Sequence, residues 1–348
     1  MRKILGLMLV VASVAVIAGT VGDATAAPAK KQDASLTGAG STFVYPLVSK
    51  WIPAAGAAYG INVNYSPIGS GGGIAAITAR TVDYGASDAP LSSDQLAACK
   101  GCVVIPWALS AISIPYNLPG IKCVLRLTPN VLSRIYLGEI TKWNDPNIVK
   151  NNGSCGLPDT KITPVYRSDN SGSTYAFTDY LSNVNSTWKS KYGTGVNAQW
   201  PAGVGAKGSS GVAGVVSKTE GALTYVDVAY SLKNKLRFAW VQNRAGKYAS
   251  PGLRGIKAAA AVIPAKITSD AQLKLVDPPK SAGGLAYPIS TFTYVIAPTS
   301  SSKAKDLRKF IYWATTRGQS YGPPLLFAPL PTQVQSYANR LINQIKQS

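Results

Sequence analysis

Short β-rich runs alternate with helical patterns along this chain from Leu36 onward. Apolar and β-branched residues mark expected strands at 61–65, 103–107, 111–116, 162–166, 222–226 and 292–297. Apolar residues at helical spacing mark expected helices at 45–59, 73–80, 130–138, 174–182, 303–316 and 333–345. Alternation of this kind predicts an α/β fold, in which helices cover mostly parallel strands.

The composition supports a large folded core. The chain has 348 residues, of which 46% are hydrophobic and 14% are charged. A chain of this length has enough apolar surface for two lobes of ordinary domain size. It contains 7 Trp and 18 Tyr and no long run of charges, a composition that argues against disorder.

The first residues have the pattern of an export signal. Arg2 and Lys3 precede an apolar run over 4–21, and small residues follow at 24–26. This predicts a secretory signal peptide over residues 1–26. A membrane anchor is the alternative, but polar residues interrupt the run and a small-residue cleavage step follows at once. No Cys lies near that step, and no later stretch is apolar enough to span a bilayer, so we expect a soluble, exported protein.

The chain is strongly basic, with a formal net charge of +20. Such a charge can favour nucleic acid or anionic membranes. The Lys and Arg residues are scattered, however, and no basic helix carries interleaved aromatic residues. We therefore interpret the charge as a surface property, expect no nucleic-acid partner, and note that it would attract small anions modestly at physiological salt.

The chain contains no His, which excludes many kinds of site. Ser-His-Asp and Cys-His mechanisms need an imidazole, and so do many metal sites. The 15 acidic residues also leave few ligands for a metal-dependent hydrolase. We therefore expect no metal and no cofactor.

The four cysteines of an exported chain predict two disulfide bonds. Cys99 and Cys102 have a C-x-x-C spacing, which also occurs in redox-active proteins. The strand and long helix that flank such redox motifs are missing here, so a local structural bridge is favoured. Cys123 would then pair with Cys155. A four-thiolate zinc site is a third alternative, disfavoured by an oxidising compartment.

Three segments share one design, in which small or hydroxyl residues come directly before a helical pattern. They are "TGAGSTFVYP" at 37–46, "GSGGGIAAI" at 69–77 and "YRSDNSGSTYAF" at 166–177. One such start is usually only a helix cap. Three of them, with glycines and the nearby Arg167, predict a seat for a small oxyanion. Free N–H groups at helix starts and a guanidinium both favour negative charge.

A fourth segment imitates a dinucleotide site. "GVGAKG" at 203–208 matches G-x-G-x-x-G, and Asp227 lies at about the expected distance beyond it. The preceding "QWPA" does not have the pattern of a buried strand, and an exported protein has little use for a dinucleotide. We therefore do not expect a Rossmann site here.

Several motifs, taken in order, resemble the periplasmic phosphate-binding proteins of phosphate-specific ABC transporters. The resemblance extends over nearly the whole mature chain. It is carried by "SLTGAGSTF" (35–43), "VNYSPIGSGGG" (63–73), "TVDYGASDAPLS" (81–92), "IYLGEITKWND" (135–145), "RSDNSGS" (167–173), "YGTGVNAQWPAGVGAKGSSGV" (192–212), "GALTYVDVAY" (221–230) and "YPISTFTYVI" (287–296).

The resemblance implies a two-lobed solute-binding fold of type II. Each lobe would have a central mixed β-sheet flanked by helices, with the ligand in the cleft. Residues 36–110 and 289–345 would form lobe I, and 111–288 lobe II. The lobes would hinge near 108–113 and 285–290 and close on inorganic phosphate. The protein, a periplasmic monomer, would then dock on the membrane permease subunits of an ABC transporter.

The resemblance also implies the site residues. Donors from both lobes would hold phosphate, with Phe43 acting through its backbone N–H and Asp169 holding Arg167 in place. The implied ligand-binding residues are Thr42, Phe43, Ser70, Asp88, Arg167, Ser171, Gly172 and Ser173. The family commonly has Thr where this chain has Ser173, and the hydroxyl is retained.

Asp88 has two interpretations. An Asp after a strand is usually a cap or a turn residue. Facing an anion, an ionised carboxylate is repulsive unless the anion supplies a proton, which phosphate does and sulfate at neutral pH does not. Asp88 would then reject sulfate, because two acceptors would oppose each other.

Two other functions remain open from the sequence. A secreted phosphatase or phosphoryl-transfer enzyme could use the same anion cradle, although the missing His and the scarcity of carboxylates count against it. A binding protein for sulfate, molybdate or a phosphonate is the other alternative. We expect a binding protein and not an enzyme.

Overall fold

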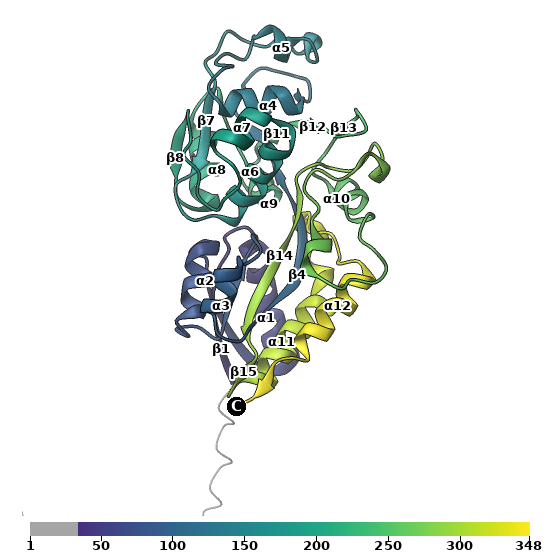
Figure 1. Ribbon diagram of the computed structural model, residues 1–348. Helices are drawn as coiled ribbons and strands as arrows, with labels where there is room; N and C mark the ends of the chain where they lie inside the picture. The colour runs from purple at the N-terminus through teal and green to yellow at the C-terminus, as the bar shows by residue number, and fades with distance from the viewer. Residues whose placement is uncertain (1–33) are drawn as a thin grey trace, which may run out of the picture. The chain divides into compact units, whose positions relative to one another are not determined.

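The computed structural model describes residues 34–348 (Figure 1). The predicted signal peptide, 1–26, lies outside the described residues. Strands and helices alternate through most of 34–348, which confirms the α/β prediction. Within this part of the chain, no helix has both the length and the apolar character that a membrane span requires.

The larger sheet is mixed. β1 pairs in parallel with β2 and β3, whereas β14 lies antiparallel between β3 and β4. The expectation of mostly parallel strands is therefore wrong at the centre of this sheet. Its strand order is β10 (Val226–Asp227), β4 (Cys102–Ser113), β14 (Ser290–Pro298), β3 (Tyr84–Ser87), β1 (Ala34–Gly40) and β2 (Ile61–Ser66).

A second mixed sheet and two small ones complete the strands of the described chain. The second sheet has the order β11 (Arg237–Phe238), β5 (Pro115–Tyr116), β9 (Ala222–Thr224), β7 (Thr163–Arg167) and β8 (Val204–Ala206). The small sheets are β13 (Tyr248–Ala249), β12 (Trp240–Gln242) and β6 (Arg126–Leu127), and the pair β15 (Ser300–Ser301) and β16 (Lys346–Gln347).

The six predicted helices all form, with shifted ends in most cases. α1 spans the predicted 45–59 and ends at Gly60, whose left-handed φ of 64° suits a residue without a Cβ. The helices are α1 (Tyr45–Tyr59), α2 (Ser70–Thr78), α3 (Ser93–Ala98), α4 (Pro129–Tyr136), α5 (Pro146–Val149), α6 (Gly172–Val184), α7 (Ser186–Lys191), α8 (Gly208–Lys218), α9 (Val228–Lys233), α10 (Leu253–Ala260), α11 (Ala304–Thr315) and α12 (Thr332–Ile342). Short 3-10 helices lie at Gly153–Cys155, Asp270–Leu273, Lys280–Ala282, Arg317–Tyr321 and Pro323–Leu325.

β4 and β14 form the long central pair of the larger sheet. The expected strands 103–107 and 111–116 are one continuous strand as far as Ser113, despite Pro106 in its middle. Proline cannot donate to a ladder and is tolerated where the pairing is irregular. The register of β14 shifts between Thr293 and Tyr294, opposite Pro106, so the irregularity lies where the proline needs it.

The chain passes directly between the two large sheets at two places. β4 ends at Ser113 in the larger sheet, and β5 starts at Pro115 in the second. The chain returns between Thr224 of β9 and Val226 of β10. These crossings give the two-lobed architecture. The lobe boundaries 36–110, 111–288 and 289–345, and the hinge segments, stay predictions.

Aromatic side chains fill the core beside each large sheet. Next to the larger sheet, Trp107 packs on Trp51 and on Tyr84, with ring centroids 5.2 and 6.1 Å apart. Next to the second sheet, Tyr225 stacks on Phe177 and Trp200 at 4.5 and 5.5 Å. The second group adjoins the predicted site, because the Tyr225 hydroxyl accepts a hydrogen bond from the Arg167 backbone N–H.

Both disulfides form. Cys99, at the end of α3, is bonded to Cys102 at the start of β4. Cys123 is bonded to Cys155. The pairing that the C-x-x-C spacing favoured is therefore the one in the structure, and the described cysteines include no free thiol.

Candidate functional site

The end of β7 places a buried arginine opposite a carboxylate. The Arg167 side chain is 2% exposed, and its Nε and Nη2 donate to the two Asp169 carboxylate oxygens at 2.7 and 2.5 Å. The backbone N–H of Arg167 donates to the Tyr225 hydroxyl, which fixes the end of the strand. Burial acts to raise the pKa of Asp169, but the Arg167 guanidinium outweighs it, so that the pKa lies below its ordinary value.

α6 starts directly after this pair. Ser171 caps the helix, and its Oγ accepts from the Thr174 N–H at 3.2 Å. Ser173, in the first turn, is fully buried, and its Oγ has no hydrogen-bond partner among the described residues. A buried hydroxyl without a partner is unusual in a folded protein and is explained most simply by a ligand or water.

The start of α2 meets the start of α6. Gly172 N–H donates to Ser70 Oγ at 3.1 Å, and Gly71 N–H donates to the Asn170 carbonyl at 3.0 Å. A Cβ on Gly172 would lie 2.6 Å from Ser70 Oγ, so only glycine permits this approach. Two helix starts about a hundred residues apart in the sequence therefore meet.

Asp88 lies in the same network, directly after β3. It is 2% exposed and accepts from Ser41 Oγ at 2.5 Å and from Ser70 Oγ at 3.4 Å. Burial raises the pKa of Asp88 to about 6, although the Ser41 hydrogen bond and the positive charge of Arg167 act to lower it. A carboxyl with this pKa changes its protonation state just below neutral pH.

The segment before α1 contributes Thr42 and Phe43. Thr42 Oγ1 lies 2.7 Å from Ser209 Oγ, and both side chains are buried. The Phe43 N–H donates to Ser41 Oγ at 3.0 Å, within its own turn, and the ring packs edge-on against Phe327. The structure thus gives the Phe43 N–H a partner inside the protein.

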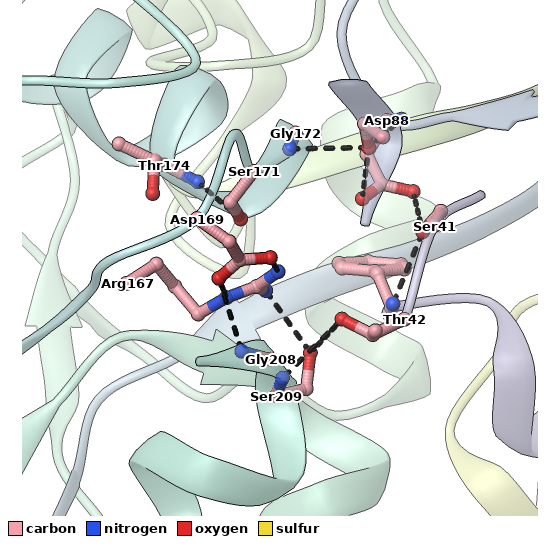
Figure 2. A network of polar contacts seen from close by, with 12 residues as sticks. Ser41, Thr42, Asp88, Arg167, Asp169, Ser171, Gly172, Thr174, Gly208 and Ser209 are labelled. Carbon is pink, nitrogen blue, oxygen red and sulfur yellow. Dashed lines mark hydrogen bonds and ion pairs between the residues drawn. The ribbon is translucent and has the colours of Figure 1, made fainter. Parts of the chain in front are cut away.

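The start of α8 was not anticipated as part of the site. Gly208 N–H donates to Asp169 Oδ1 at 3.0 Å, and Ser209 N–H donates to Thr42 Oγ1 at 3.3 Å. Arg167 Nη1 donates to Ser209 Oγ at 3.3 Å (Figure 2). A signal was present, since "KGSSG" repeats the small-residue helix start of the other segments, but the dinucleotide-like match at 203–208 obscured it.

The structure thus brings most of the predicted site residues into two hydrogen-bonded groups, one around Asp88 and Ser70 and one around Arg167 and Asp169, and it leaves Ser173 Oγ without a partner. It adds Ser41, Gly208 and Ser209, which sequence reasoning missed. Ser41 follows β1 and Asp88 follows β3, and the pairing of these two strands that brings the side chains together is not visible in sequence. The predicted site residues are Thr42, Phe43, Ser70, Asp88, Arg167, Asp169, Ser171, Gly172 and Ser173.

The chemistry of this network is that of an anion receptor. Hydroxyls, helix-start N–H groups and a buried guanidinium supply donors from several elements. The carboxylates of Asp88 and Asp169 are the acidic groups in it, and Asp169 is held by Arg167. Within residues 34–348, no group of three or more His, Cys, Asp and Glu is placed to hold a metal ion.

Comparison with known proteins gives a consistent result. A family model described as a PBP superfamily domain matches residues 24–317. A curated phosphate-binding protein PstS from Xylella fastidiosa (strain Temecula1) is 39% identical over 325 residues, covering 90% of this chain and 88% of that protein. A protein of the same name from Pasteurella multocida (strain Pm70) is 37% identical over 307 residues, covering 87% of this chain and 88% of that one.

Solved structures share the fold. A high affinity periplasmic phosphate-binding protein, determined with bound phosphate at pH 8.5, aligns with a TM-score of 0.69 and 22% identity. The alignment covers 88% of this chain and 93% of that one. This likeness, together with the two sheets and their direct crossings, establishes the two-lobed periplasmic binding protein fold.

Proposed function

This chain belongs to the PBP superfamily and, within it, to the PstS phosphate-binding proteins, and from that premise we propose that it is an exported receptor for inorganic phosphate. The observation that carries the proposal is the convergence of three helix starts on one buried arginine. Arg167 Nη1 donates to Ser209 Oγ at the start of α8, and Gly172 at the start of α6 donates to Ser70 at the start of α2. A Cβ at Gly69, the residue before α2, would lie 3.7 Å from Arg167 Nη2, so the start of α2 also approaches the guanidinium. Such a cluster of donors complements a tetrahedral oxyanion.

The proposed ligand contacts come from both sides of the network. Arg167 would provide the charge, and Ser173 Oγ, buried without a partner, would donate to a phosphate oxygen. Thr42, Ser70 and Ser171 would add hydroxyl donors. The N–H groups of Phe43 and Gly172 donate to Ser41 Oγ and Ser70 Oγ in this structure and would share their hydrogens with the ligand. Asp169 would orient Arg167, since a bidentate pair fixes the plane of the guanidinium. Ser209 joins this set by its contacts to Arg167 and Thr42.

Asp88 is the proposed reader of the ligand's proton. Phosphate at neutral pH carries at least one proton and can donate to a carboxylate, whereas sulfate cannot. An ionised Asp88 opposite a sulfate oxygen would leave two acceptors without a proton in a buried place, at a cost of about 1–3 kcal/mol or more. The site would thereby discriminate between two anions of nearly equal size and shape.

The destination of the phosphate follows from the family. Curated relatives are named phosphate-binding proteins PstS, and a further solved structure of this fold is described as a putative phosphate ABC transporter substrate-binding protein. We infer that this chain acts as a periplasmic monomer and delivers phosphate to the permease subunits of an ABC transporter. The proposed signal peptide, 1–26, supplies the export step.

Calorimetry with phosphate, arsenate and sulfate at pH 7.5 tests the proposal. A single binding event is expected for phosphate and arsenate, with sulfate weaker by about 5- to 150-fold, which corresponds to the ~1–3 kcal/mol cost of one unpaired buried group. A phosphate monoester added as a fourth ligand tests the alternative enzyme. Release of phosphate from that ester, abolished by Arg167→Ala, would favour catalysis and contradict a pure receptor.

A further inference from the structure

A groove of about 650 Å³ lies beside the Arg167 network described above. Thr42 and Gly208 line it, and both also belong to the network. The Thr42–Ser209 contact at 2.7 Å forms the boundary between the two. The groove is of a size that holds small-molecule ligands and exceeds what one phosphate requires.

The charge of this groove is entirely positive. Lys50, Lys207 and Lys233 line it, and no Asp or Glu does. Within residues 34–348, none of the three forms an ion pair with a carboxylate. Three unneutralised ammonium groups around one concave surface favour a ligand that carries several negative charges.

The lysines come from opposite sides of the structure. Lys50 is on α1, which packs on β2 of the larger sheet, whereas Lys207 directly precedes α8, which packs on β7 of the second sheet. Lys233 ends α9. An anion held between Lys50 and Lys207 would therefore bridge the two sides at the Thr42–Ser209 contact.

A second cavity beside the network has the opposite character. It measures about 240 Å³ and is lined by Asp88, Asp179 and Asp270, with Lys274 as its basic residue. Lys274 is paired with Asp179 at 2.9 Å. Because this side presents carboxylates and the groove presents free lysines, anions are favoured on the groove side.

We propose that the Lys50–Lys207–Lys233 groove is a second phosphoanion site, which takes a condensed phosphate such as tripolyphosphate while the inner site holds orthophosphate. Such a ligand carries several linked phosphoryl groups, so it offers negative charge to all three lysines, and it fills more of the groove than a single phosphate does. Binding across both sides stabilises the closed arrangement. It therefore raises the affinity of the inner site for orthophosphate, a coupling that rests on the proposed function.

Titration of tripolyphosphate into protein saturated with orthophosphate tests this proposal. One equivalent is expected to bind, more weakly as salt rises. The double variant Lys207→Gln/Lys233→Gln is expected to weaken it by about tenfold, the upper range for two exposed ion pairs. Lys305→Gln/Lys309→Gln, which removes the same charge from exposed positions on α11, is the control and is expected to change it less than about twofold.

Four outcomes would overturn the proposal. The first three are no tripolyphosphate binding to the saturated protein, equal weakening by the α11 control pair, and equal affinity of the groove for orthophosphate and tripolyphosphate. An oligonucleotide that displaces tripolyphosphate at equal phosphate concentration would likewise assign the groove to nucleic acid. Orthophosphate titrated alone into the groove variants should stay within about twofold of the unmodified protein, since the lysines lie outside the inner network. A larger loss of orthophosphate affinity in the groove variants would bear on the proposed orthophosphate site and not on the second site.

Discussion

The backbone N–H of Gly172 donates to the hydroxyl of Ser70 across 3.1 Å, and this bond joins the first residues of α6 and α2. In the predicted lobe division Ser70 belongs to lobe I and Gly172 to lobe II, so we expect this contact to form when the lobes close. It also explains why position 172 is glycine, because the nearest side-chain atoms leave no room for a Cβ.

Gly172→Ala should oppose closure. The added methyl group would meet Ser70 Oγ at 2.6 Å and the Asp88 backbone N at 2.7 Å. Overpacking of this kind costs about 1–3 kcal/mol, so phosphate affinity measured by calorimetry should fall by about tenfold or more. Gly214→Ala is the matched control, because it lies within α8 with nothing within 4 Å of its Cβ position. It should leave binding unchanged and stabilise the protein by about 0.5–1 kcal/mol.

Arg167→Ala should weaken phosphate binding by about 2–5 kcal/mol, because a desolvated charge partner is lost and Asp169 is left without its pair. Arg134→Ala provides the comparison. Arg134 forms an ion pair with Glu139 at 2.9 Å and is far more exposed than Arg167. Its removal should alter stability by less than about 1 kcal/mol and leave affinity intact. Equal affinities of the two variants in a phosphate titration would remove Arg167 from the site.

Asp88 should make sulfate binding depend on pH. Its pKa of about 6 means that the carboxyl becomes protonated as pH falls below neutrality and can then donate to sulfate. Sulfate affinity of the unmodified protein should therefore rise between pH 7.5 and 5. Asp88→Asn carries an N–H donor at every pH and should bind sulfate with little pH dependence over this range. A sulfate affinity that is flat in both proteins would contradict the proton-reading role.

The same carboxyl should affect stability in a defined direction. Its pKa rises from 3.8 to about 6 on folding, so between these pH values the native state binds more protons than the unfolded chain. The contribution of Asp88 to the free energy of unfolding is then fully present below about pH 3.8 and is lost as pH rises through 6, by up to about 3 kcal/mol. Urea unfolding of the protein and of Asp88→Asn from pH 4 to 7 should show a shallower pH dependence in the variant. Part of the pH dependence should remain in the variant, because Asp227 is also buried and burial raises its pKa.

The two disulfides should contribute unequally to stability. Cys99 and Cys102 are separated by 3 positions, and Cys123 and Cys155 by 32. In the chain-entropy model the longer loop gives about 4 kcal/mol and the shorter about 2 kcal/mol. Thermal unfolding of the two double Cys→Ser variants should follow that order, with phosphate affinity preserved in both. Loss of phosphate binding in the Cys99/Cys102 variant alone would show that this bridge supports the site.

The elements that could be predicted from sequence are those defined by local signals. The range of α1 was predicted correctly, because its apolar pattern ends at a glycine that adopts the left-handed conformation. β3 was missed, because Tyr84–Ser87 has only four residues, three of them small, and therefore shows no alternation of apolar and polar side chains. β4 was predicted as two strands, 103–107 and 111–116, whereas it is continuous over Cys102–Ser113 and pairs with β14 along its length.

The same division applies to the site. Arg167, Asp169, Ser171 and Gly172 are adjacent in sequence, so their local grouping was visible. The contacts of Ser41 with Asp88 and of Ser209 with Thr42 depend on strand order and on how the sheets meet, and no local pattern contains that information.

The position of β14 determines when the larger sheet can form during synthesis of the chain. β14 lies between β3 and β4 in the larger sheet, yet it is synthesised long after both. A nascent chain that stops short of Ser290 therefore exposes two strand edges with unpaired backbone groups, which are open to pairing with other chains. The N-terminal part of this protein should accordingly not fold as a fragment, and the larger sheet can be completed only when almost the entire polypeptide has emerged from the ribosome.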